Sequence, residues 1–447
     1  MKKTVRDKLT FALSVCAGCL LALLLLRSPD FDPQHQHGIY TAHAESGETL
    51  PPAQGRSYYE HQWALKNNGL IRRITSVYRH DSSQGESGQT APDSGFGGGP
   101  GVTGPGSGDG ESGPGAGLPD SAAPEAKQEV YEQITDSVAG VDMAMEKAWA
   151  FYEQLPQRRI VTVAIIDTGV DTSHEELAGS IWVNEDEIPG DGIDNDNNGY
   201  IDDVNGWNFY SGTNQVFVGE EDDHGTHGAG TVAAAWDGQG IVGIADSSYV
   251  KIMVLKVLGS QEGVGVSSNV KRAIRYAQAN GADICSLSMG TLTYDGEMDR
   301  LISDSPMLFV VSAGNGDAAG KGYDIDALPM YPAAFSSDHI ITVGNLMFDG
   351  NLDESSNYGA VSVDLAAPGT YILGAVPGNG YAYMTGTSMA APMVTGTAAL
   401  VYSCRTDFSL MDVREAILNS ARKMEGLEGK VATGGMVDAY GAISYGR

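Results

Sequence analysis

The chain has 447 residues, which suits roughly two or three domains or one large α/β domain. It carries 57 acidic against 27 basic residues, a formal net charge of −30. Phosphate recognition needs a basic surface, so this charge excludes nucleic acid as a partner. Beyond the N-terminal region the cysteines are Cys285 and Cys404. Both lie in apolar stretches, which predicts buried thiols rather than a disulfide.

The N-terminus has the layout of an export signal. Basic residues at positions 2, 3, 6 and 8 precede an apolar run over residues 9–26. Ala42-His43-Ala44 is a small-x-small site at which a signal covering 1–44 would be cleaved. The alternative is an uncut membrane anchor, because a run of this length can span a bilayer. Both alternatives predict a secreted or cell-envelope protein, and the signal is bacterial in type.

The remainder predicts a short leader over 45–56 and one folded domain over 57–447. Within that domain, a segment over about 72–127 is dominated by Gly, Ser, Pro and Asp. Such a composition cannot bury enough apolar area to offset the entropy lost on ordering, so we predict a disordered insertion. The alternative is that everything before about residue 128 is pro-segment and linker.

Beyond the insertion, apolar strand-like runs alternate with helix-like segments. Buried continuous strands that alternate with helices predict an α/β fold, a three-layer sandwich with a mainly parallel, doubly wound sheet. In such sheets the active site lies beyond the carboxyl ends of the strands. The expected strands cover residues 160–166, 249–257, 282–288, 307–312 and 340–343, with a helix over 267–280 and further helices beginning near 224 and 388.

Three polar residues stand at such positions. Asp167 follows an apolar strand directly, His224 opens a glycine-rich helix, and Ser388 lies at the N-terminus of another helix, where free N–H groups stabilise negative charge. Taken singly, each has an ordinary structural alternative. Asp167 is then a turn cap and Ser388 an N-cap. His224 with His227 is then half of a metal site.

In combination these segments resemble the subtilase family, whose catalytic residues follow in the order Asp, His, Ser. The matching motifs are Asp167-Thr168-Gly169, His224-Gly225-Thr226-His227 and Gly386-Thr387-Ser388-Met389. Ser312-Ala313-Gly314-Asn315 resembles the family segment that carries an oxyanion-hole Asn. The resemblance extends from about Tyr131 to the C-terminus. It implies a subtilisin-like fold and serine endopeptidase activity.

The resemblance also implies a role for each residue. Ser388 would attack the peptide carbonyl after His224 takes its proton, and His224 would return that proton to the leaving amine. Asp167 would hold the imidazole tautomer and stabilise the imidazolium. The Ser388 backbone N–H and the Asn315 side-chain amide would bind the oxyanion. His227 is expected to be structural.

The segments 286–290 and 263–265 resemble the strands that line the family's substrate cleft. An extended peptide would bind them as an added strand through main-chain hydrogen bonds. Small residues before Asn315 would line an apolar pocket for P1, the residue before the cleaved bond, which implies a preference for bulky uncharged side chains. The expected substrate-binding residues are Ser288, Met289, Gly290, Gly263, Gly265, Ala313 and Gly314.

An acidic loop over residues 191–203 carries oxygen ligands at alternate positions. Asp194, Asp196 and Asn198 match the first three ligand positions of an EF-hand loop, although the twelfth position holds Asn205 instead of a bidentate Glu. The alternative is a solvated acidic turn. We expect a structural calcium ion, because carboxylates this close repel one another unless neutralised. The candidate ligands are Asp191, Asp194, Asp196, Asn198, Tyr200, Asp202 and Asp203.

The features together predict an exported, monomeric serine endopeptidase that acts on polypeptides through an acyl-enzyme and meets a membrane only through an uncut signal. One alternative is a catalytically inactive subtilase-like surface binding module. Another is a serine esterase, which the lack of a Gly-x-Ser-x-Gly elbow disfavours. The segment 58–69, with Gln62-Trp63, resembles the start of many subtilase domains, and a first helix is expected over 141–152.

Overall fold

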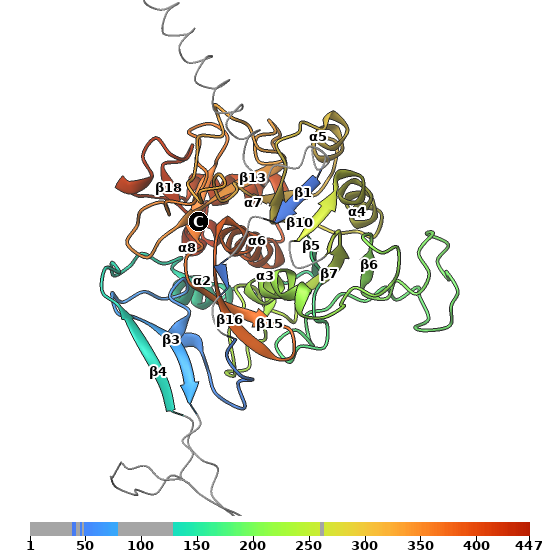
Figure 1. The fold of residues 1–447 in the computed structure, drawn as a ribbon, viewed down its shortest axis with the longest axis horizontal. Helices are drawn as coiled ribbons and strands as arrows, with labels where there is room; N and C mark the ends of the chain where they lie inside the picture. The colour runs from blue at the N-terminus through green and yellow to red at the C-terminus, as the bar shows by residue number, and fades with distance from the viewer. Residues whose placement is uncertain (1–37, 42–44, 47–48, 79–127, 260–262) are drawn as a thin grey trace, which may run out of the picture. The chain divides into compact units, whose positions relative to one another are not determined.

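The computed structural model describes residues 38–41, 45–46, 49–78, 128–259 and 263–447 (Figure 1). These residues divide into two compact units, one running up to Arg73 and from Glu132 to Arg447, the other from Ile74 to Tyr131. The apolar run of the predicted export signal lies outside the described residues. Among the described helices, none combines the length and apolar character needed to span a bilayer.

A nine-stranded sheet forms the centre of the larger unit. Its order is β17-β18-β14-β13-β12-β10-β5-β7-β6, and every neighbouring pair is parallel except β17 with β18. The middle strands are wholly buried, as expected for apolar strands covered on both faces. The strands are β5 Val161–Asp167, β6 Gly206–Asn208, β7 Val250–Lys256, β10 Ile284–Leu287, β12 Leu308–Ser312, β13 Ile340–Leu346, β14 Leu365–Pro368, β17 Arg422–Lys423 and β18 Gly435–Met436.

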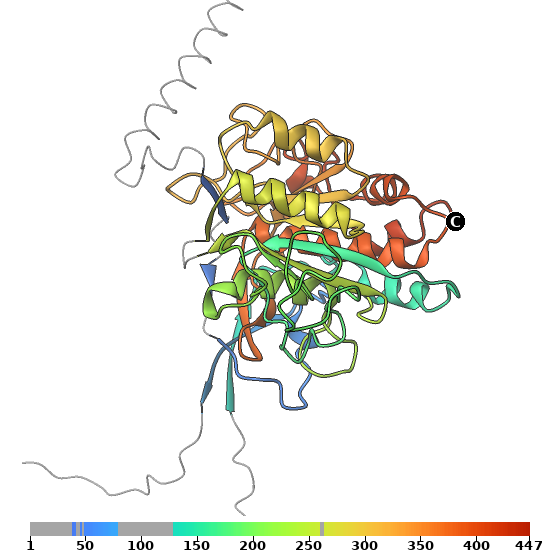
Figure 2. The same cartoon turned by 90° about the vertical axis from the view of Figure 1, so that its right-hand side faces the viewer.

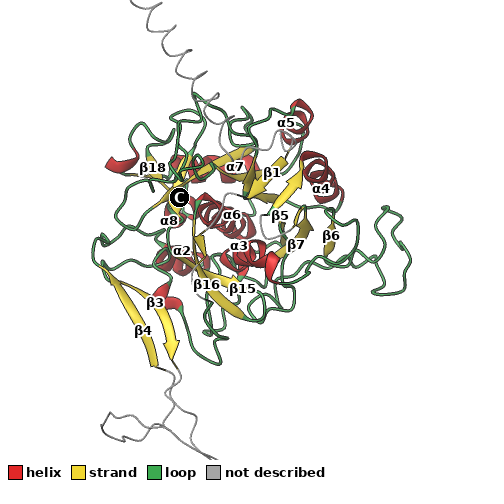
Figure 3. Cartoon of the chain, in the orientation of Figure 1, coloured by secondary structure: helices red, strands yellow, loops and turns green. Residues whose placement is uncertain are grey.

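Helices cover both faces of this sheet (Figures 1 and 2), and Figure 3 separates the two kinds of element by colour. Helix α4 packs on β5 from one side, whereas α6 and α3 pack on it from the other. Helix α6 is made mostly of small and apolar residues and is buried along almost its whole length, because the sheet and α3 enclose it. The predicted three-layer α/β sandwich is confirmed. The helices are α2 Met145–Tyr152, α3 Asp223–Ala233, α4 Ser267–Ala279, α5 Gly296–Ser303, α6 Thr387–Cys404, α7 Leu410–Asn419 and α8 Ala439–Ile443, with short 3-10 turns η2 Tyr59–His61, η3 Glu220–Asp222 and η4 Glu425–Leu427.

Three smaller sheets complete the described structure. One has the order β11-β1-β9-β8, another β15-β16-β2, and the third pairs β3 with β4. The first two bring strands from the N-terminal region against strands from the middle and end of the chain. The strands are β1 Gly38–Thr41, β2 Glu45–Ser46, β3 Ile71–Tyr78, β4 Gln128–Ile134, β8 Leu258–Gly259, β9 Val264–Val266, β11 Met289–Gly290, β15 Ile372–Val376 and β16 Gly380–Thr385.

Two predicted boundaries differ from the structure. Residues 72–78, predicted to open the disordered insertion, belong to β3, whose β-branched and aromatic residues favour a strand. The first helix begins at Met145 rather than at residue 141. Ala144 has a φ of 56°, a left-handed conformation that cannot continue an α-helix, so the helix starts only after it.

The segment that resembles a domain start is packed into the larger unit. Trp63 is buried, and its Nε1 donates to the Thr370 carbonyl at 2.9 Å. The Gln62 amide exchanges two hydrogen bonds with the backbone of Val242, at 2.9 and 2.8 Å. These contacts pack residues 62 and 63 against segments far along the chain. The thiols of Cys285 and Cys404 are buried and free, as predicted.

Candidate active site

Asp167 and His224 form a buried hydrogen-bonded pair at the carboxyl edge of the sheet. Asp167 is the last residue of β5, and His224 lies in the first turn of α3. His224 Nδ1 lies 2.8 Å from Asp167 Oδ1, and both side chains are almost fully enclosed. An ionised carboxylate can only accept, so Nδ1 carries the proton and donates. The imidazole is thereby held in the tautomer that leaves Nε2 free to act as a base.

Close approach between two backbone segments brings this pair together. A Cβ on Gly225 would lie 2.1 Å from the Gly169 carbonyl oxygen, so only glycine allows α3 to begin against the turn that follows β5. The Gly225 N–H donates to Thr168 Oγ1 at 3.1 Å. The glycine after the histidine therefore positions the imidazole beside the strand-end carboxylate.

A buried ion pair fixes the start of α3. Lys256 ends β7, next to Asp167 in the parallel register. Its Nζ lies 2.7 Å from Asp222 Oδ1 and 2.9 Å from Glu221 Oε1, and it also donates to the Thr168 carbonyl. The side chains of Lys256 and Asp222 are 1% and 0% exposed. Removing one member of such a pair typically costs about 3–5 kcal/mol, because the other charge stays buried.

The two histidines of α3 differ in their electrostatics. Burial disfavours the imidazolium of His224, but the charge and hydrogen bond of Asp167 outweigh burial and raise its pKa. Burial lowers the pKa of His227 to about 4, so that ring is neutral at pH 7. His227 Nε2 lies 3.0 Å from the Ile372 carbonyl, to which it donates. His227 therefore has the structural role expected of it.

Ser388 lies in the first turn of α6, and a proline shapes its surroundings. Pro392 has no N–H, so it cannot bond the Ser388 carbonyl four residues earlier. The Ser288 hydroxyl donates to that carbonyl instead, at 3.1 Å. The Ser388 hydroxyl in turn lies 3.4 Å from the Ser288 carbonyl. Ser288, predicted to bind substrate, thus also ties the cleft strand to the helix that carries Ser388.

Thr387 orients the Asn315 side chain, a contact that the sequence motifs alone do not reveal. Asn315 Oδ1 accepts from the Thr387 N–H at 2.8 Å and from the Thr387 hydroxyl at 2.7 Å. With Oδ1 held in this way, the amide nitrogen turns toward Gly386, where it lies 2.6 Å from the position a Cβ would take. A donor group is therefore fixed next to the N-terminus of α6, where Ser388 lies.

The predicted substrate cleft already contains a strand of the chain itself. Strand β1 pairs antiparallel with both β9 and β11, so that Ile39 lies opposite Gly265 and Tyr40 opposite Gly290. Strand β2 pairs antiparallel with the end of β16, just before Ser388 in the sequence. The strands predicted to bind an extended peptide therefore have the backbone geometry to do so.

A cavity of about 880 Å³ extends from this edge of the sheet. Asn315 lies in its wall, together with Gly316, Thr385 and Met330. Met330 also contacts the predicted cleft residues Gly290 and Gly314. The sequence motifs do not predict Met330, because it lies outside all of them and reaches this edge of the sheet only in the folded chain.

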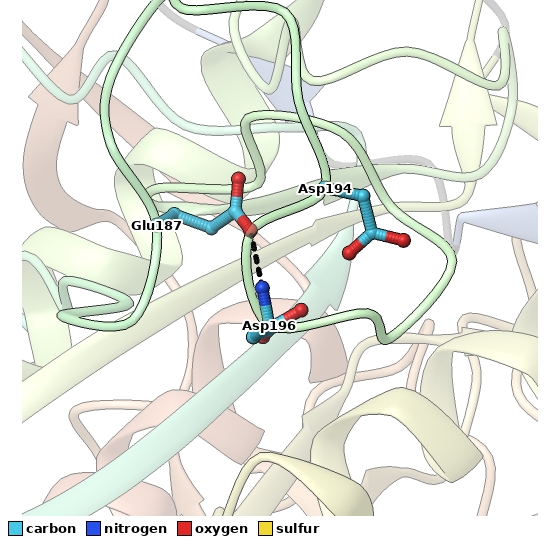
Figure 4. A group of neighbouring side chains, drawn as sticks. All are labelled: Glu187, Asp194 and Asp196. Carbon is cyan, nitrogen blue, oxygen red and sulfur yellow. Dashed lines mark hydrogen bonds between the residues drawn. The ribbon is translucent and has the colours of Figure 1, made fainter.

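The acidic loop brings three carboxylates together (Figure 4). Oxygen atoms of Glu187, Asp194 and Asp196 lie within 4.8 Å of one another. Ligands of one calcium ion at about 2.3–2.6 Å are separated by up to about 5 Å, so this spacing fits the ion. No salt bridge to Lys or Arg compensates these three groups in the described part of the chain. Glu187 precedes the loop in sequence and was missed.

Other predicted ligands are directed elsewhere. Asp202 accepts from three consecutive backbone N–H groups of residues 190–192. Asp203 is buried and accepts from Asn184, Asn198 and the Tyr276 hydroxyl. Asp191 bonds within its own turn, to residues 193 and 195. These three carboxylates stabilise the loop, and of the predicted acidic ligands only Asp194 and Asp196 join the cluster.

The mainly parallel sheet and a buried Asp–His pair at its carboxyl edge define a subtilisin-like α/β protein. The chain belongs to the subtilase family, whose model matches residues 158–442. "Subtilisin-like protease 1" of Plasmodium berghei is 31% identical over 63% of this chain and 49% of its own length. "Thermitase" of Thermoactinomyces vulgaris is 33% identical over 63% of this chain and 88% of its own length.

The fold is also similar to that of a solved structure. Fervidolysin from Fervidobacterium pennivorans, described as a keratinolytic enzyme related to subtilisin, matches with a TM-score of 0.53 and 25% identity. The match covers 67% of this chain and 45% of that one. The chain thus spans about half the length of fervidolysin and of the Plasmodium protein.

The electrostatic contrast between the two histidines predicts different titrations. We expect His224 to protonate with a midpoint above 6.5, because Asp167 favours the imidazolium, and His227 to remain neutral down to about pH 4. Histidine ring signals followed by NMR between pH 3 and 9 measure both. Asp167→Asn should lower the His224 midpoint and leave that of His227 unchanged. A His224 midpoint below 6.5 in the unmodified protein contradicts this account.

Proposed function

We propose that the chain is a serine endopeptidase in which Asp167, His224 and Ser388 are the catalytic triad. One observation carries the proposal: a member of the subtilase family holds a buried His224 with Nδ1 on a carboxylate, the arrangement that prepares Nε2 as a base. The position of Ser388 in the first turn of α6, which packs on α3, supports its role as nucleophile.

Each step uses a group of the chain. Ser388 Oγ leaves its long contact with Ser288, transfers its proton to His224 Nε2 and attacks the substrate carbonyl. Nε2 forms no hydrogen bond to the described residues. The Asn315 amide and the Ser388 backbone N–H stabilise the oxyanion. His224 then protonates the leaving amine, and water hydrolyses the acyl-enzyme through the same base.

The cleft supports polypeptides as the substrate class. Strands β9 and β11 offer main-chain groups on both sides of an inserted strand, and β1 uses them. Main-chain hydrogen bonds act on any extended peptide, so affinity does not depend on one sequence.

Replacing the nucleophile tests the activity. Ser388→Ala in residues 45–447 should abolish casein hydrolysis in calcium buffer, a loss of about 10⁶-fold on the scale known for subtilisin. Wild type should also react with a fluorophosphonate probe, whereas the variant should not. Thermal unfolding of both proteins provides the control, because a folded variant shows that the loss is chemical.

The alternative is an inactive surface module that uses the cleft only for binding. A folded wild-type protein that neither cleaves casein nor reacts with the fluorophosphonate establishes this alternative and removes the protease proposal. A protein that reacts with the probe but spares casein is instead a selective protease.

We also propose a structural calcium ion, held by Glu187, Asp194 and Asp196. Three uncompensated carboxylates within 4.8 Å support it, and a carboxylate has about four lone-pair sites, so those used by the loop N–H groups leave others for a cation. The ion would stabilise the loop between β5 and β6 and would take no part in the reaction.

Calcium removal tests this site. Chelation by EGTA should lower the melting temperature, since calcium at about 100 times its Kd contributes about 2.7 kcal/mol to folding. Asp194→Asn should lower the melting temperature in calcium and reduce the response to EGTA. Asp186→Asn makes the same charge change at an exposed position outside the cluster and should keep the wild-type response. An unchanged melting temperature in EGTA removes the proposal.

Finally, we propose that the protein is exported and that loss of residues 1–44 opens the cleft. The basic and apolar N-terminus supports export. The pairing of β1 with β9 and β11 supports the second point, because a substrate strand needs the same main-chain groups.

Peptide binding measures this effect without self-cleavage. In the Ser388→Ala background, residues 45–447 should bind a fluorescent peptide of residues 36–41 at least about 10-fold more tightly than the full chain does. The apparent affinity of a site is its intrinsic affinity multiplied by the fraction of molecules in which the site is free, and β1 lowers that fraction in the full chain. Tyr40→Pro in the full chain removes a ladder N–H and should recover part of the difference. Equal affinities of the long and short chains contradict the proposal.

A further inference from the structure

The register of β1 shows which substrate position meets the nucleophile. Tyr40 lies opposite Gly290 and Thr41 opposite Met289, so a bound strand in this register continues with its next residue opposite Ser288. The Ser288 carbonyl lies 3.4 Å from the Ser388 hydroxyl. The substrate residue opposite Ser288 is therefore P1, whose carbonyl carbon Ser388 attacks.

The pleat of the strand then gives the direction of the P1 side chain. Residues directly opposite each other in an antiparallel pair project to the same face, and so do residues two apart on one strand. The P1 side chain therefore projects to the same face of the sheet as a Cβ on Gly290 would. That direction leads to Met330, whose Cε lies 2.4 Å from the ideal Cβ position.

Met330 also contacts the opposite wall of the P1 pocket, which the segment before Asn315 forms. A Cβ on Gly314, next to the oxyanion residue Asn315, would lie 2.5 Å from Met330 Sδ. The thioether thus lies between β11, which contains Gly290, and the segment that contains Gly314 and Asn315. Gly290 and Gly314 form the two facing walls, and neither has a side chain. Met330 fills the volume between them.

Two sets of contacts hold Met330 in place. The next residue, Tyr331, exchanges two backbone hydrogen bonds with Thr291, each 2.8 Å, which fixes this segment alongside the end of β11. On the other side, the buried Asn357 amide lies 3.6 Å from Met330 Sδ and donates to the Ala313 carbonyl at 3.0 Å. Met330 is therefore positioned by the same groups that shape the two walls.

We propose that Met330 determines specificity by filling the depth of the P1 pocket, so that the enzyme cleaves after small residues such as alanine, glycine and serine. The inference rests on the proposed protease function and deepens it. It replaces the expectation of bulky P1 side chains, which considered only the small residues Ala313 and Gly314. An aromatic P1 side chain would collide with the thioether.

Two matched substrates test the pocket: succinyl-Ala-Ala-Pro-Ala and succinyl-Ala-Ala-Pro-Phe p-nitroanilides. For protein expressed from the full-length chain, kcat/KM should favour the alanine substrate. Met330→Ala should shift the ratio toward phenylalanine by at least about 10–200-fold, the range that a single extra or missing methylene group in an apolar pocket is worth. Met330→Leu, of similar volume, should keep the preference for alanine.

Controls separate specificity from folding and from the protease proposal itself. Met411→Ala removes the same side chain from a half-buried position on α7 and should leave the ratio unchanged. Fluorophosphonate titration gives the concentration of active sites for each variant. A wild-type preference for phenylalanine, an unchanged ratio in Met330→Ala, or a labelled enzyme that cleaves neither peptide overturns the pocket assignment. A folded wild type that does not label at all overturns the protease function instead.

Discussion

The parallel register of the central sheet is the constraint on which the site depends. It places the carboxyl ends of β5 and β7 side by side, with Asp167 next to Lys256. The buried Lys256 charge must be compensated, and Asp222 at the entry to α3 compensates it. The ion pair therefore fixes where α3 begins, and the beginning of α3 fixes His224 against Asp167. A charge outside the proposed triad thus sets the geometry of its Asp167–His224 pair.

The sequence predicted the sheet well, and it predicted that Asp167 and His224 lie together at the carboxyl edge, for physical reasons. Strands such as β5 and β12 are continuous apolar runs, because both their faces are covered, and such runs are visible without neighbours. The boundary of the first helix was less predictable, since the left-handed Ala144 before it follows from tertiary packing. What the sequence could not give were the residues that act from outside the motifs. Glu187 joins the acidic cluster and Met330 reaches the cleft only once the chain has folded.

The same limit applies to the expected P1 pocket. Small residues at Ala313 and Gly314 indicate space, but space in a folded protein belongs to whichever side chain packs into it. Met330 arrives from a segment that follows β12 and is held by Asn357 and by the pairing of Tyr331 with Thr291. The motifs thus supply the groups proposed to react, whereas Met330, which lies outside them, is proposed to decide which P1 side chains fit.

Preorganisation is the property that connects these observations. Asn315 has both bonds to its Oδ1 supplied by Thr387, so its amide donor needs no reorientation when an oxyanion forms. The Ser288 hydroxyl donates to the Ser388 carbonyl, which Pro392 leaves without a helical partner, and this bond holds the start of α6 against the Ser288 segment. In water these dipoles would have to reorganise during the reaction. Here the folding energy of the sheet and of α6 has already fixed them, and a bound strand need only add its own main-chain bonds to complete the site.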